Sequence, residues 1–442
     1  MVRKLRAVSQ GASVPHRKNT SGQSTERMPV PKQVTLMMQQ HIGAPAKPVV
    51  KKGDEVLVGQ MVGEAGGFVS SPVYSGVSGK VKALEQVVAA NGALVEAVVI
   101  ETDGQQTLSG DVAVPQVHNR ESFLEAVRAC GLVGLGGAGF PTAVKLSPKE
   151  LDKIDILLIN GAECEPYITS DEQEILENSG DILSGIAAVQ KYLGIERAVI
   201  GIERNKPEAM DLLFSLTKGK AGIEVHPLPS KYPQGAEKVL IEQVTGRQVP
   251  AGGLPSDVGV IVLNVTTAGT LGRYLSTGMP LVTKRLTVDG GAVAQPKNVE
   301  VILGTSVAEV IEFCGGYKEP PGKLLMGGPM MGVALPGDGY PVMKQNNAIL
   351  ALSAAEAALP EEGPCIRCGR CIASCPMSLS PTETEEAYKN RDLDRLKKLN
   401  ADVCIACGVC SYVCPAKRYV SQHANLARGY LLKEVAKERG KS

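Results

Sequence analysis

The chain lacks tryptophan, and aromatic residues make up only 4% of its 442 residues. So few flat rings argue against a surface that stacks on single-stranded bases. Neither sign of charge prevails, since 47 Lys and Arg stand against 46 Asp and Glu and the net charge is +1. This balance removes the usual electrostatic argument for a nucleic-acid-binding protein.

Long apolar runs are also missing. No stretch approaches the roughly 18 apolar residues that a transmembrane helix needs. The first residues, MVRKLRAVSQ, are basic but no apolar run follows them, so no signal peptide is predicted. We therefore expect a protein that works inside the cell and has no transmembrane segment of its own.

Cysteine is the residue in excess, and its distribution is uneven. Eight of the 11 cysteines fall between Cys365 and Cys414, whereas Cys130, Cys164 and Cys314 are scattered. A disulfide scaffold spreads its cysteines through a short secreted chain, but clustered cysteines in a reducing compartment indicate a metal site. The three scattered cysteines are expected to be ordinary buried residues.

The clustered cysteines repeat one spacing, C-x2-C-x2-C-x3-C-P, which is that of bacterial two-cluster ferredoxins. In that arrangement the fourth cysteine of each group binds the other cluster, and we expect it to open a helix that carries it there. Cluster 1 is thus predicted to take Cys365, Cys368, Cys371 and Cys414, and cluster 2 to take Cys404, Cys407, Cys410 and Cys375. A structural zinc site is the alternative, although zinc needs only four thiolates, commonly as two C-x2-C pairs.

Apart from the cysteines, the chain has the composition of a packed globular protein, with 43% hydrophobic and 21% charged residues. Helical and strand-like segments alternate from about His118, which predicts a largely parallel sheet covered by helices. Before this region, short strands broken by glycine resemble the small β-sandwich of lipoyl and biotinyl domains. The hairpin tip at Ala65–Phe68 has no lysine to modify.

The remaining segments complete a multidomain α/β and α+β chain. Segments between Leu281 and Pro336 resemble the ubiquitin-like (β-grasp) SLBB module. A polar helix is predicted over 382–399 and a short basic amphipathic helix over 425–442. The expected domains are an N-terminal arm (1–30), the sandwich (31–117), the α/β domain (118–275), the SLBB-like module (276–350) and a helical ferredoxin-like domain (351–442).

A glycine string, Gly134-Leu-Gly136-Gly137-Ala-Gly139, lies in the predicted α/β domain. The string matches G-x-G-x-x-G, but a dinucleotide-binding fingerprint requires a strand before it, and here a helix comes first. A glycine-rich turn without a ligand is therefore the alternative. If a ligand binds, these glycines would let backbone N–H groups approach a flavin or nucleotide phosphate.

Longer motifs around the string favour a ligand. GLVGLGGAGFPTAVKL, INGAECEPYITSD, GAEK and VLNVTTA resemble the flavin-binding subunit of respiratory complex I. VPHRKNT, MPVPKQVTLMMQQHIGAPAKPVVKKGD and MGGPMMG resemble the RnfC family, the peripheral subunits of Rnf ferredoxin:NAD oxidoreductase complexes, over nearly the whole chain.

The resemblance implies FMN and NAD(H) sites in the α/β domain, and two 4Fe–4S clusters. Gly134, Gly136, Gly137, Gly139, Lys145, Asn160 and Asn264 would hold FMN. Phe140 would stack on the NADH adenine. Glu163 and Glu165 come just after the end of a predicted strand, and Glu165 would lie beside the nicotinamide. Glu237 would lie near the ribose and flavin. Leu135, Ala162 and Leu146 depart from the complex I pattern, which weakens the transfer of nucleotide contacts more than that of flavin contacts.

The expected function is electron transfer between NAD(H) and ferredoxin through FMN and the clusters, with no catalytic side chain of the protein. The resemblance implies integral membrane partners that move Na⁺ or H⁺, a ferredoxin-like RnfB-type partner, and a peripheral position on the cytoplasmic face of the membrane. The alternatives are a soluble cobalamin reductase of the PduS type, an electron relay without a working NADH site, and a docking subunit that holds zinc. The module order, with the sandwich first and the clusters near the end, argues against the cobalamin reductase.

Overall fold

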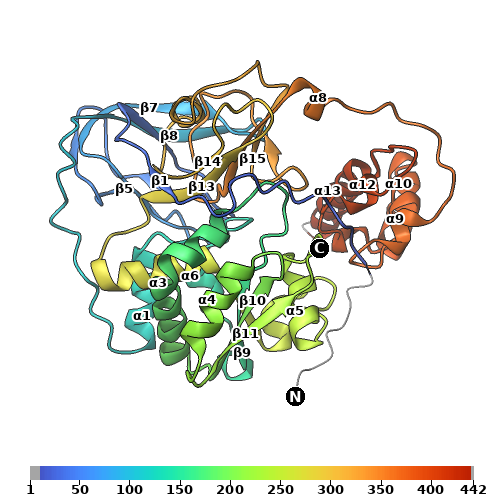
Figure 1. Cartoon of the computed structure of the whole chain (residues 1–442), viewed down its shortest axis with the longest axis horizontal. Helices are drawn as coiled ribbons and strands as arrows, with labels where there is room; N and C mark the ends of the chain where they lie inside the picture. Colours follow the sequence, from blue (N-terminus) through green and yellow to red (C-terminus); the bar gives the residue numbers. More distant parts are fainter. Residues whose placement is uncertain (1–9, 440–442) are drawn as a thin grey trace.

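The computed structural model describes residues 10–439 and divides into three regions (Figure 1). A β-rich region lies beside a parallel-sheet domain, and a small helical domain follows after a long connection. Within the described residues, no helix combines the length and the apolar character needed to cross a bilayer.

The sandwich predicted near the N-terminus is present as two antiparallel sheets. The first has the strand order β2-β8-β7-β4 and the second β3-β5-β6. The strands are β2 (Gln33–Met37), β3 (Lys47–Pro48), β4 (Glu55–Val56), β5 (Met61–Glu64), β6 (Val73–Tyr74), β7 (Gly79–Val88) and β8 (Leu94–Thr102). The predicted tip falls between β5 and β6. It exposes Phe68, and a Cβ at Gly66 would lie 2.0 Å from the Pro45 carbonyl oxygen, so the turn requires glycine there.

The parallel sheet has the order β11-β10-β9-β12. Its apolar strands are buried on both faces, as helix-covered parallel strands must be. The elements are α1 (Arg120–Ala129), α2 (Thr142–Lys145), β9 (Ile156–Gly161), α3 (Ser170–Leu193), β10 (Arg197–Glu203), α4 (Pro207–Thr217), β11 (Ile223–Leu228), α5 (Glu237–Thr245), β12 (Val260–Asn264) and α6 (Val265–Thr277). The chain leaves β9 toward β10 on one side and reaches β12 on the other, so the order reverses between β9 and β12.

A third sheet, with the order β1-β14-β13-β17-β15-β16, contains the SLBB-like module. Its elements are β1 (Glu26–Arg27), β13 (Thr283–Asp289), β14 (Lys297–Ile302), α7 (Val307–Phe313), β15 (Lys323–Met326), β16 (Val333–Ala334), β17 (Ala348–Leu352) and the following α8 (Ala354–Ala357). The N-terminal segment supplies the edge strand β1, which pairs in parallel with β14. The expected arm is therefore part of the packed structure from residue 10 onward, and its first nine residues lie outside the described range.

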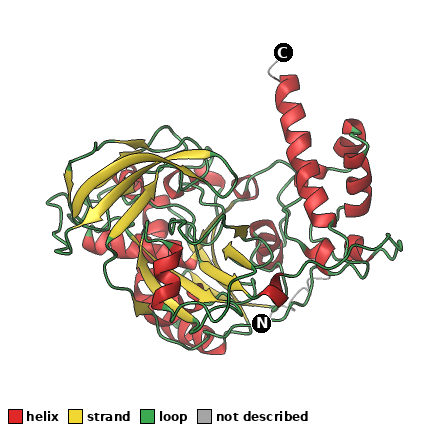
Figure 2. Cartoon of the chain, turned by 90° about the horizontal axis from the view of Figure 1, so that it is seen from above, coloured by secondary structure: helices red, strands yellow, loops and turns green. Residues whose placement is uncertain are grey.

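The C-terminal domain is helical, and Figure 2 shows its last helix extending away from the body of the molecule. The helices are α9 (Arg370–Ala373), α10 (Pro381–Lys389), α11 (Leu393–Lys398), α12 (Val409–Tyr412) and α13 (Val420–Arg439). The predicted basic tail helix thus begins earlier than expected, and its last three residues lie outside the described part.

Two sequence-based expectations are wrong in this domain. The single polar helix predicted over 382–399 is broken into α10 and α11, because Arg391 has a φ of 54° and the Asp392 side chain accepts a hydrogen bond from Arg395 N to begin α11. The fourth cysteine of each group does not open a helix. Cys375 and Cys414 each follow a four-residue helical turn that contains the third cysteine, because a glycine with positive φ, Gly369 or Gly408, starts that turn ahead of the third cysteine.

Candidate functional site: a strand-end pocket and two cysteine groups

The candidate nucleotide site begins with two asparagines at the carboxyl ends of adjacent strands. Asn160 is the next-to-last residue of β9, Asn264 is the last residue of β12, and the two are direct partners in the parallel register. They therefore sit at the point where the strand order reverses, which is where α/β sheets bind ligands. Asn264 also caps α6, because its side-chain oxygen accepts from the N–H groups of Thr266 (2.9 Å) and Thr267 (3.2 Å).

The glycine loop lies directly against this point. A Cβ at Gly136 would lie 2.5 Å from the Asn264 amide nitrogen, so the close approach requires glycine. The backbone at Leu135 is fixed on both sides, because its N–H donates to Thr267 Oγ1 (3.0 Å) and its carbonyl accepts from the buried Lys284 ammonium (3.0 Å). Residues 136–138 are exposed, whereas Gly139 is buried and Phe140 half-buried. The loop thus presents exposed backbone beside the asparagine pair.

Two further predicted residues meet on the other side of Asn160. The Asn160 amide donates to the Gly235 carbonyl (2.9 Å), which leads into α5. Glu237, the first residue of that helix, pairs with the Lys145 ammonium at 2.8 Å. Both charged side chains are partly exposed, so the pair lies at the rim of the site. One end of the sheet thereby brings together five predicted residues: Lys145, Asn160, Glu237, Asn264 and Gly136.

The loop after β9 carries the two predicted acids into different surroundings. The Glu163 carboxylate is buried and accepts from the N–H of Asp171 (2.6 Å), and burial raises its pKa. Asp171 in turn accepts from the Asn264 amide at 2.6 Å, so Glu163 is linked through Asp171 to the asparagine pair. Glu165 instead accepts from the N–H groups of Met330 (3.0 Å) and Met331 (2.9 Å), and burial raises its pKa to about 7.

Sequence reasoning missed two lysines beneath this loop. Lys18, from the N-terminal segment, donates to the carbonyls of Glu163 (2.9 Å), Glu165 (3.1 Å) and Ile168. Lys206 donates to the carbonyl of Ala162 at 2.8 Å. Lys206 is buried and the Lys18 side chain is 11% exposed, and desolvation lowers the pKa of Lys18. Lys18 stands within the VPHRKNT motif, whereas no motif contains Lys206. The motif does not tell what Lys18 contacts, because only the folded chain brings the two lysines under the loop.

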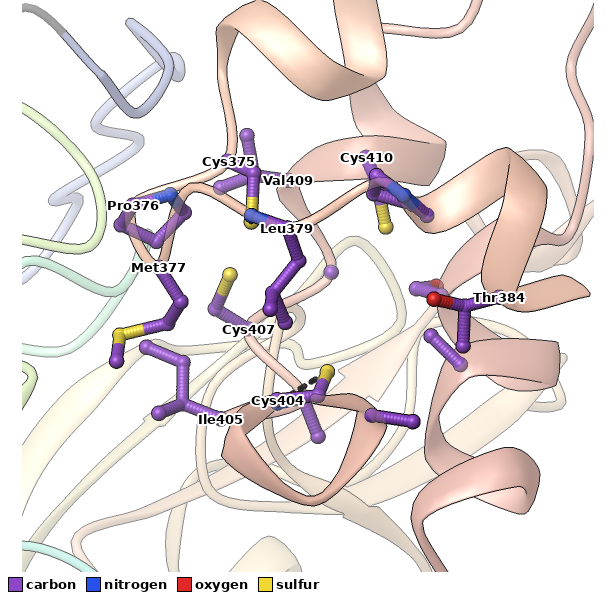
Figure 3. A pocket seen from close by; sticks show the side chains of 16 residues that line it. Cys375, Pro376, Met377, Leu379, Thr384, Cys404, Ile405, Cys407, Val409 and Cys410 are labelled. Carbon is purple, nitrogen blue, oxygen red and sulfur yellow. Dashed lines mark hydrogen bonds between the residues drawn. The ribbon is translucent and has the colours of Figure 1, made fainter. Parts of the chain in front are cut away.

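The second cysteine group and the last cysteine of the first surround one cavity (Figure 3). The sulfurs of Cys375, Cys404, Cys407 and Cys410 are directed into about 490 Å³ of empty space, part of it open to solvent. The N–H of residue 379 donates to Cys375 Sγ, and that of residue 406 to Cys404 Sγ, both at 3.4 Å. This places together the four residues predicted for cluster 2.

The four thiols surround a space instead of converging on one point. Across residues 10–439, no three Cys, His, Asp or Glu side chains are placed to hold a single metal ion. A structural zinc needs four ligands at about 2.0–2.3 Å from one centre. The arrangement therefore fits a cluster of several atoms better than one zinc ion.

The residues predicted for cluster 1 differ in exposure. Cys371 is buried, and the Cys414 thiol is within electrostatic reach of it. Cys365 and Cys368 are exposed on the loop before α9. Cys130 and Cys314 are buried as expected, whereas Cys164 lies in the loop after β9 and accepts from Gly235 N at 3.3 Å.

Family models match four parts of the chain. These are the RnfC barrel-sandwich hybrid domain (residues 6–105), the Nuo51 FMN-binding domain (127–273), the SLBB domain (285–334) and the 4Fe–4S dicluster domain (359–415). The predicted multidomain fold class is confirmed by these matches, and so are the FMN and two-cluster modules.

Two relatives match over most of their length. The chain is 42% identical to a subunit of the proton-translocating ferredoxin:NAD(+) oxidoreductase complex of Clostridium ljungdahlii, over 83% of this chain and 80% of that protein. It is 41% identical to the corresponding subunit of the Na(+)-translocating complex of Acetobacterium woodii, over 88% and 89%. The match covers 50% of a longer relative, a subunit of an ion-translocating oxidoreductase complex from Pseudomonas aeruginosa, at 39% identity.

A solved structure shares the fold. An NAD+-reducing NiFe-hydrogenase in its air-oxidised state superposes with a TM-score of 0.51, over 73% of this chain and 65% of that chain, at 18% identity. The chain thus spans slightly less than two thirds of that protein. At this identity the likeness concerns the architecture alone.

Proposed function

The chain belongs to the RnfC family of subunits of ion-translocating ferredoxin:NAD(+) oxidoreductase complexes, and on this premise we propose how its residues hold the cofactors. It is a subunit of a membrane complex and carries an FMN-binding domain and a domain for two 4Fe–4S clusters. Membership of this family agrees with the module order that argued against a cobalamin reductase.

We propose that FMN lies across the exposed glycine loop at the carboxyl ends of β9 and β12. The observation that carries this assignment is the meeting of Gly136, Asn160 and Asn264 at the point where the strand order reverses. The backbone of Gly134, Gly136, Gly137 and Gly139 would line the flavin, Lys145 would supply positive charge, and the two asparagine amides would supply polar contacts. When bound, FMN exchanges a hydride with NAD(H) and exchanges single electrons with the clusters.

The residues for NAD(H) surround that position. Phe140, half-buried next to the exposed loop, would stack on the adenine, and Glu237 at the rim would contact the ribose. Glu163 and Glu165 would order the loop beside the nicotinamide, with Lys18 and Lys206 holding its carbonyls from below. The protein's part in the reaction is to bind and orient FMN and NAD(H).

For the clusters we propose the crossed ligand sets. Cluster 1 is held by Cys365, Cys368, Cys371 and Cys414, and cluster 2 by Cys404, Cys407, Cys410 and Cys375. The convergence of Cys375 with the second group on one cavity supports the second set. Backbone N–H groups that donate to the Cys375 and Cys404 sulfurs are the kind of contact that tunes cluster potential.

The expected partners of this chain are the other subunits of the complex. We propose that this chain lies on the cytoplasmic face of the membrane, where integral membrane subunits and a ferredoxin-like RnfB-type subunit dock on it. They would carry electrons between it and ferredoxin and couple the transfer to movement of Na⁺ or H⁺. The chain itself would be the peripheral, NAD(H)-facing end of that route.

The test is anaerobic purification followed by assays of FMN, iron and sulfide, and then an NADH titration with visible spectra. We expect the flavin band to bleach before the cluster bands. Gly136→Ala should lose FMN and keep iron and sulfide, because its Cβ would displace Asn264. Gly180→Ala, in α3 with nothing within 4 Å of the new Cβ, is the matched control and should keep both.

Two outcomes would contradict the proposal. Full iron and sulfide content with no spectral response to NADH after FMN is supplied would make the chain an electron relay. Zinc in place of iron and sulfide would make it a docking subunit.

A further inference from the structure

One tyrosine joins the parallel-sheet domain to a predicted cluster ligand. Tyr232, in the segment between β11 and α5, is 1% exposed, and its hydroxyl donates to the Cys407 carbonyl at 2.8 Å. Around this bond, Tyr232 packs in an apolar cluster with Ala12, Val14 and Val409. A polar bond enclosed in apolar contacts is protected from water and fixes the distance between the groups it joins.

The backbone of Tyr232 is held as firmly as its side chain. Its N–H donates to the Ala12 carbonyl (3.0 Å), and its own carbonyl accepts from Ala12 N (2.8 Å). The same segment continues to Gly235, which accepts from Asn160, and to Glu237, which pairs with Lys145. A short run of chain therefore connects the candidate flavin site to the hydroxyl that contacts Cys407.

Glu165 provides a second connection between the parallel-sheet domain and the second cysteine group. Its carboxylate lies within electrostatic reach of the Tyr232 hydroxyl and accepts a hydrogen bond from the N–H of Met330. The Met330 carbonyl and side chain in turn lie against Gly408, the residue after Cys407. The loop after β9 thus reaches the second cysteine group both through a tyrosine and through a methionine.

The predicted cluster 1 site is more open to solvent, although its Cys371 is buried. Cys365 and Cys368 are exposed, whereas Cys407 is buried in the seam with the parallel-sheet domain. Because electron tunnelling weakens steeply with distance, the cluster in the seam is the one placed to exchange electrons with the flavin. The exposed group is then the one available to a partner.

From this geometry we infer that Tyr232 is a positioning residue for electron transfer: its hydroxyl fixes the position of the second cluster site relative to the flavin site. The inference rests on the proposed function and adds an assignment to it. Cluster 2 becomes the immediate redox partner of the flavin, and Tyr232 acts through the Cys407 peptide without touching the reacting atoms.

The test is Tyr232→Phe, which removes only the hydroxyl. We expect FMN, iron and sulfide contents and the rate of flavin bleaching by NADH to be unchanged. The later reduction of the clusters should slow by about tenfold or more, as is typical when an outer-shell partner of a metal ligand is removed. In the dithionite-reduced protein, the electron paramagnetic resonance signal of cluster 2, identified as the one missing from Cys404→Ser, should shift while that of cluster 1 stays.

Tyr412→Phe is the matched control. The Tyr412 hydroxyl donates to the Ser13 carbonyl at 3.4 Å in the same seam, but the side chain is exposed. Its loss should leave both cluster signals and both rates as in the unmodified chain. An equal slowing in the two variants would overturn the assignment, because any seam hydroxyl would then serve.

A second variant covers the case in which Tyr232→Phe loses its cofactors. Glu165→Gln removes the negative charge near the hydroxyl without altering the helical domain, and it should shift the cluster 2 signal in dithionite-reduced protein, where no nucleotide is needed. Unchanged signals in both variants would refute the role of Tyr232 and leave the proposed function standing. An unmodified chain that holds both clusters but does not react with NADH would refute the proposed function instead.

Discussion

At the scale of single residues, burial separates side chains that look equivalent in the sequence. Glu163 and Glu165 are two positions apart, yet the first is tied to Asp171 and the second to the Met330–Met331 backbone. Both carboxylates are removed from water, and desolvation favours the protonated form of a carboxylic acid. The two glutamates therefore differ in what they contact around the loop after β9, although their residue type is the same.

This burial predicts a pH-dependent stability. Burial raises the pKa of Glu165 from 4.5 to about 7, so between these values the folded state binds more protons than the unfolded state. The free energy of unfolding should therefore fall as pH rises from about 5 to about 7, and by the linkage relation Glu165 accounts for at most about 3 kcal/mol of that fall. Anaerobic urea titrations at several pH values would measure it.

Glu165→Gln cannot titrate and should flatten this part of the profile, whatever it does to stability at a single pH. Glu55→Gln, at an exposed position on the sandwich, is the control and should leave the slope unchanged. A slope that is the same in all three proteins would show that Glu165 does not contribute to it.

At the scale of elements, the parallel-sheet domain depends on the close packing of α3 against α6. A Cβ at Gly185 of α3 would lie 2.0 Å from the Ala268 carbonyl oxygen, and one at Gly272 of α6 would lie 2.1 Å from that of Asp181. Glycines on both helices let the backbones approach. Because α6 begins at the capping residue Asn264, the position of this helix also sets the position of the candidate flavin site.

Gly185→Ala should accordingly destabilise the protein by about 1–3 kcal/mol, the usual cost of overpacking. Gly180→Ala lies in the same helix with open space around the new Cβ, so it should be neutral or stabilise by about 0.5–1 kcal/mol. Thermal unfolding of the two variants side by side measures the difference. Equal melting temperatures would mean that the helices can separate without loss.

At the scale of the whole molecule, segments distant in sequence complete each other's sites. The N-terminal segment pairs with the SLBB-like sheet through β1, supports the loop after β9 through Lys18, and contacts the helical domain where Gly11 N donates to the Ser374 carbonyl. In the helical domain itself, Cys375 joins the second cysteine group across about 30 residues of chain.

The crossed ligand sets predict which cluster each cysteine variant loses. Cys375→Ser should lose the same electron paramagnetic resonance signal as Cys404→Ser, and Cys414→Ser the same signal as Cys365→Ser. Each variant should keep FMN and about half of the iron, since the flavin and the clusters are held by different domains. Cys314→Ser, at a buried position outside the helical domain, is the control and should keep all the iron. If Cys375→Ser instead matched Cys365→Ser, each group would bind its own cluster.

The sequence by itself determined the features that depend on neighbours in the chain. The repeated cysteine spacing predicted a two-cluster domain, and the alternation of helical and strand-like segments predicted a largely parallel sheet covered by helices, because local spacing fixes which side chains share a loop or a face. The break between α10 and α11 was missed, since a left-handed residue at Arg391 leaves little trace in a polar pattern.

Only the tertiary structure decided how these parts meet. The strand register sets Asn160 beside Asn264, Lys18 lies under a distant loop, and Tyr232 contacts Cys407. Each of these contacts joins residues that are from about a hundred to almost two hundred positions apart. Such contacts are fixed by the packing of whole elements against each other, and no local pattern encodes that packing. The composition of the electron-transfer modules is therefore readable in the sequence, whereas their order in space is a property of the fold.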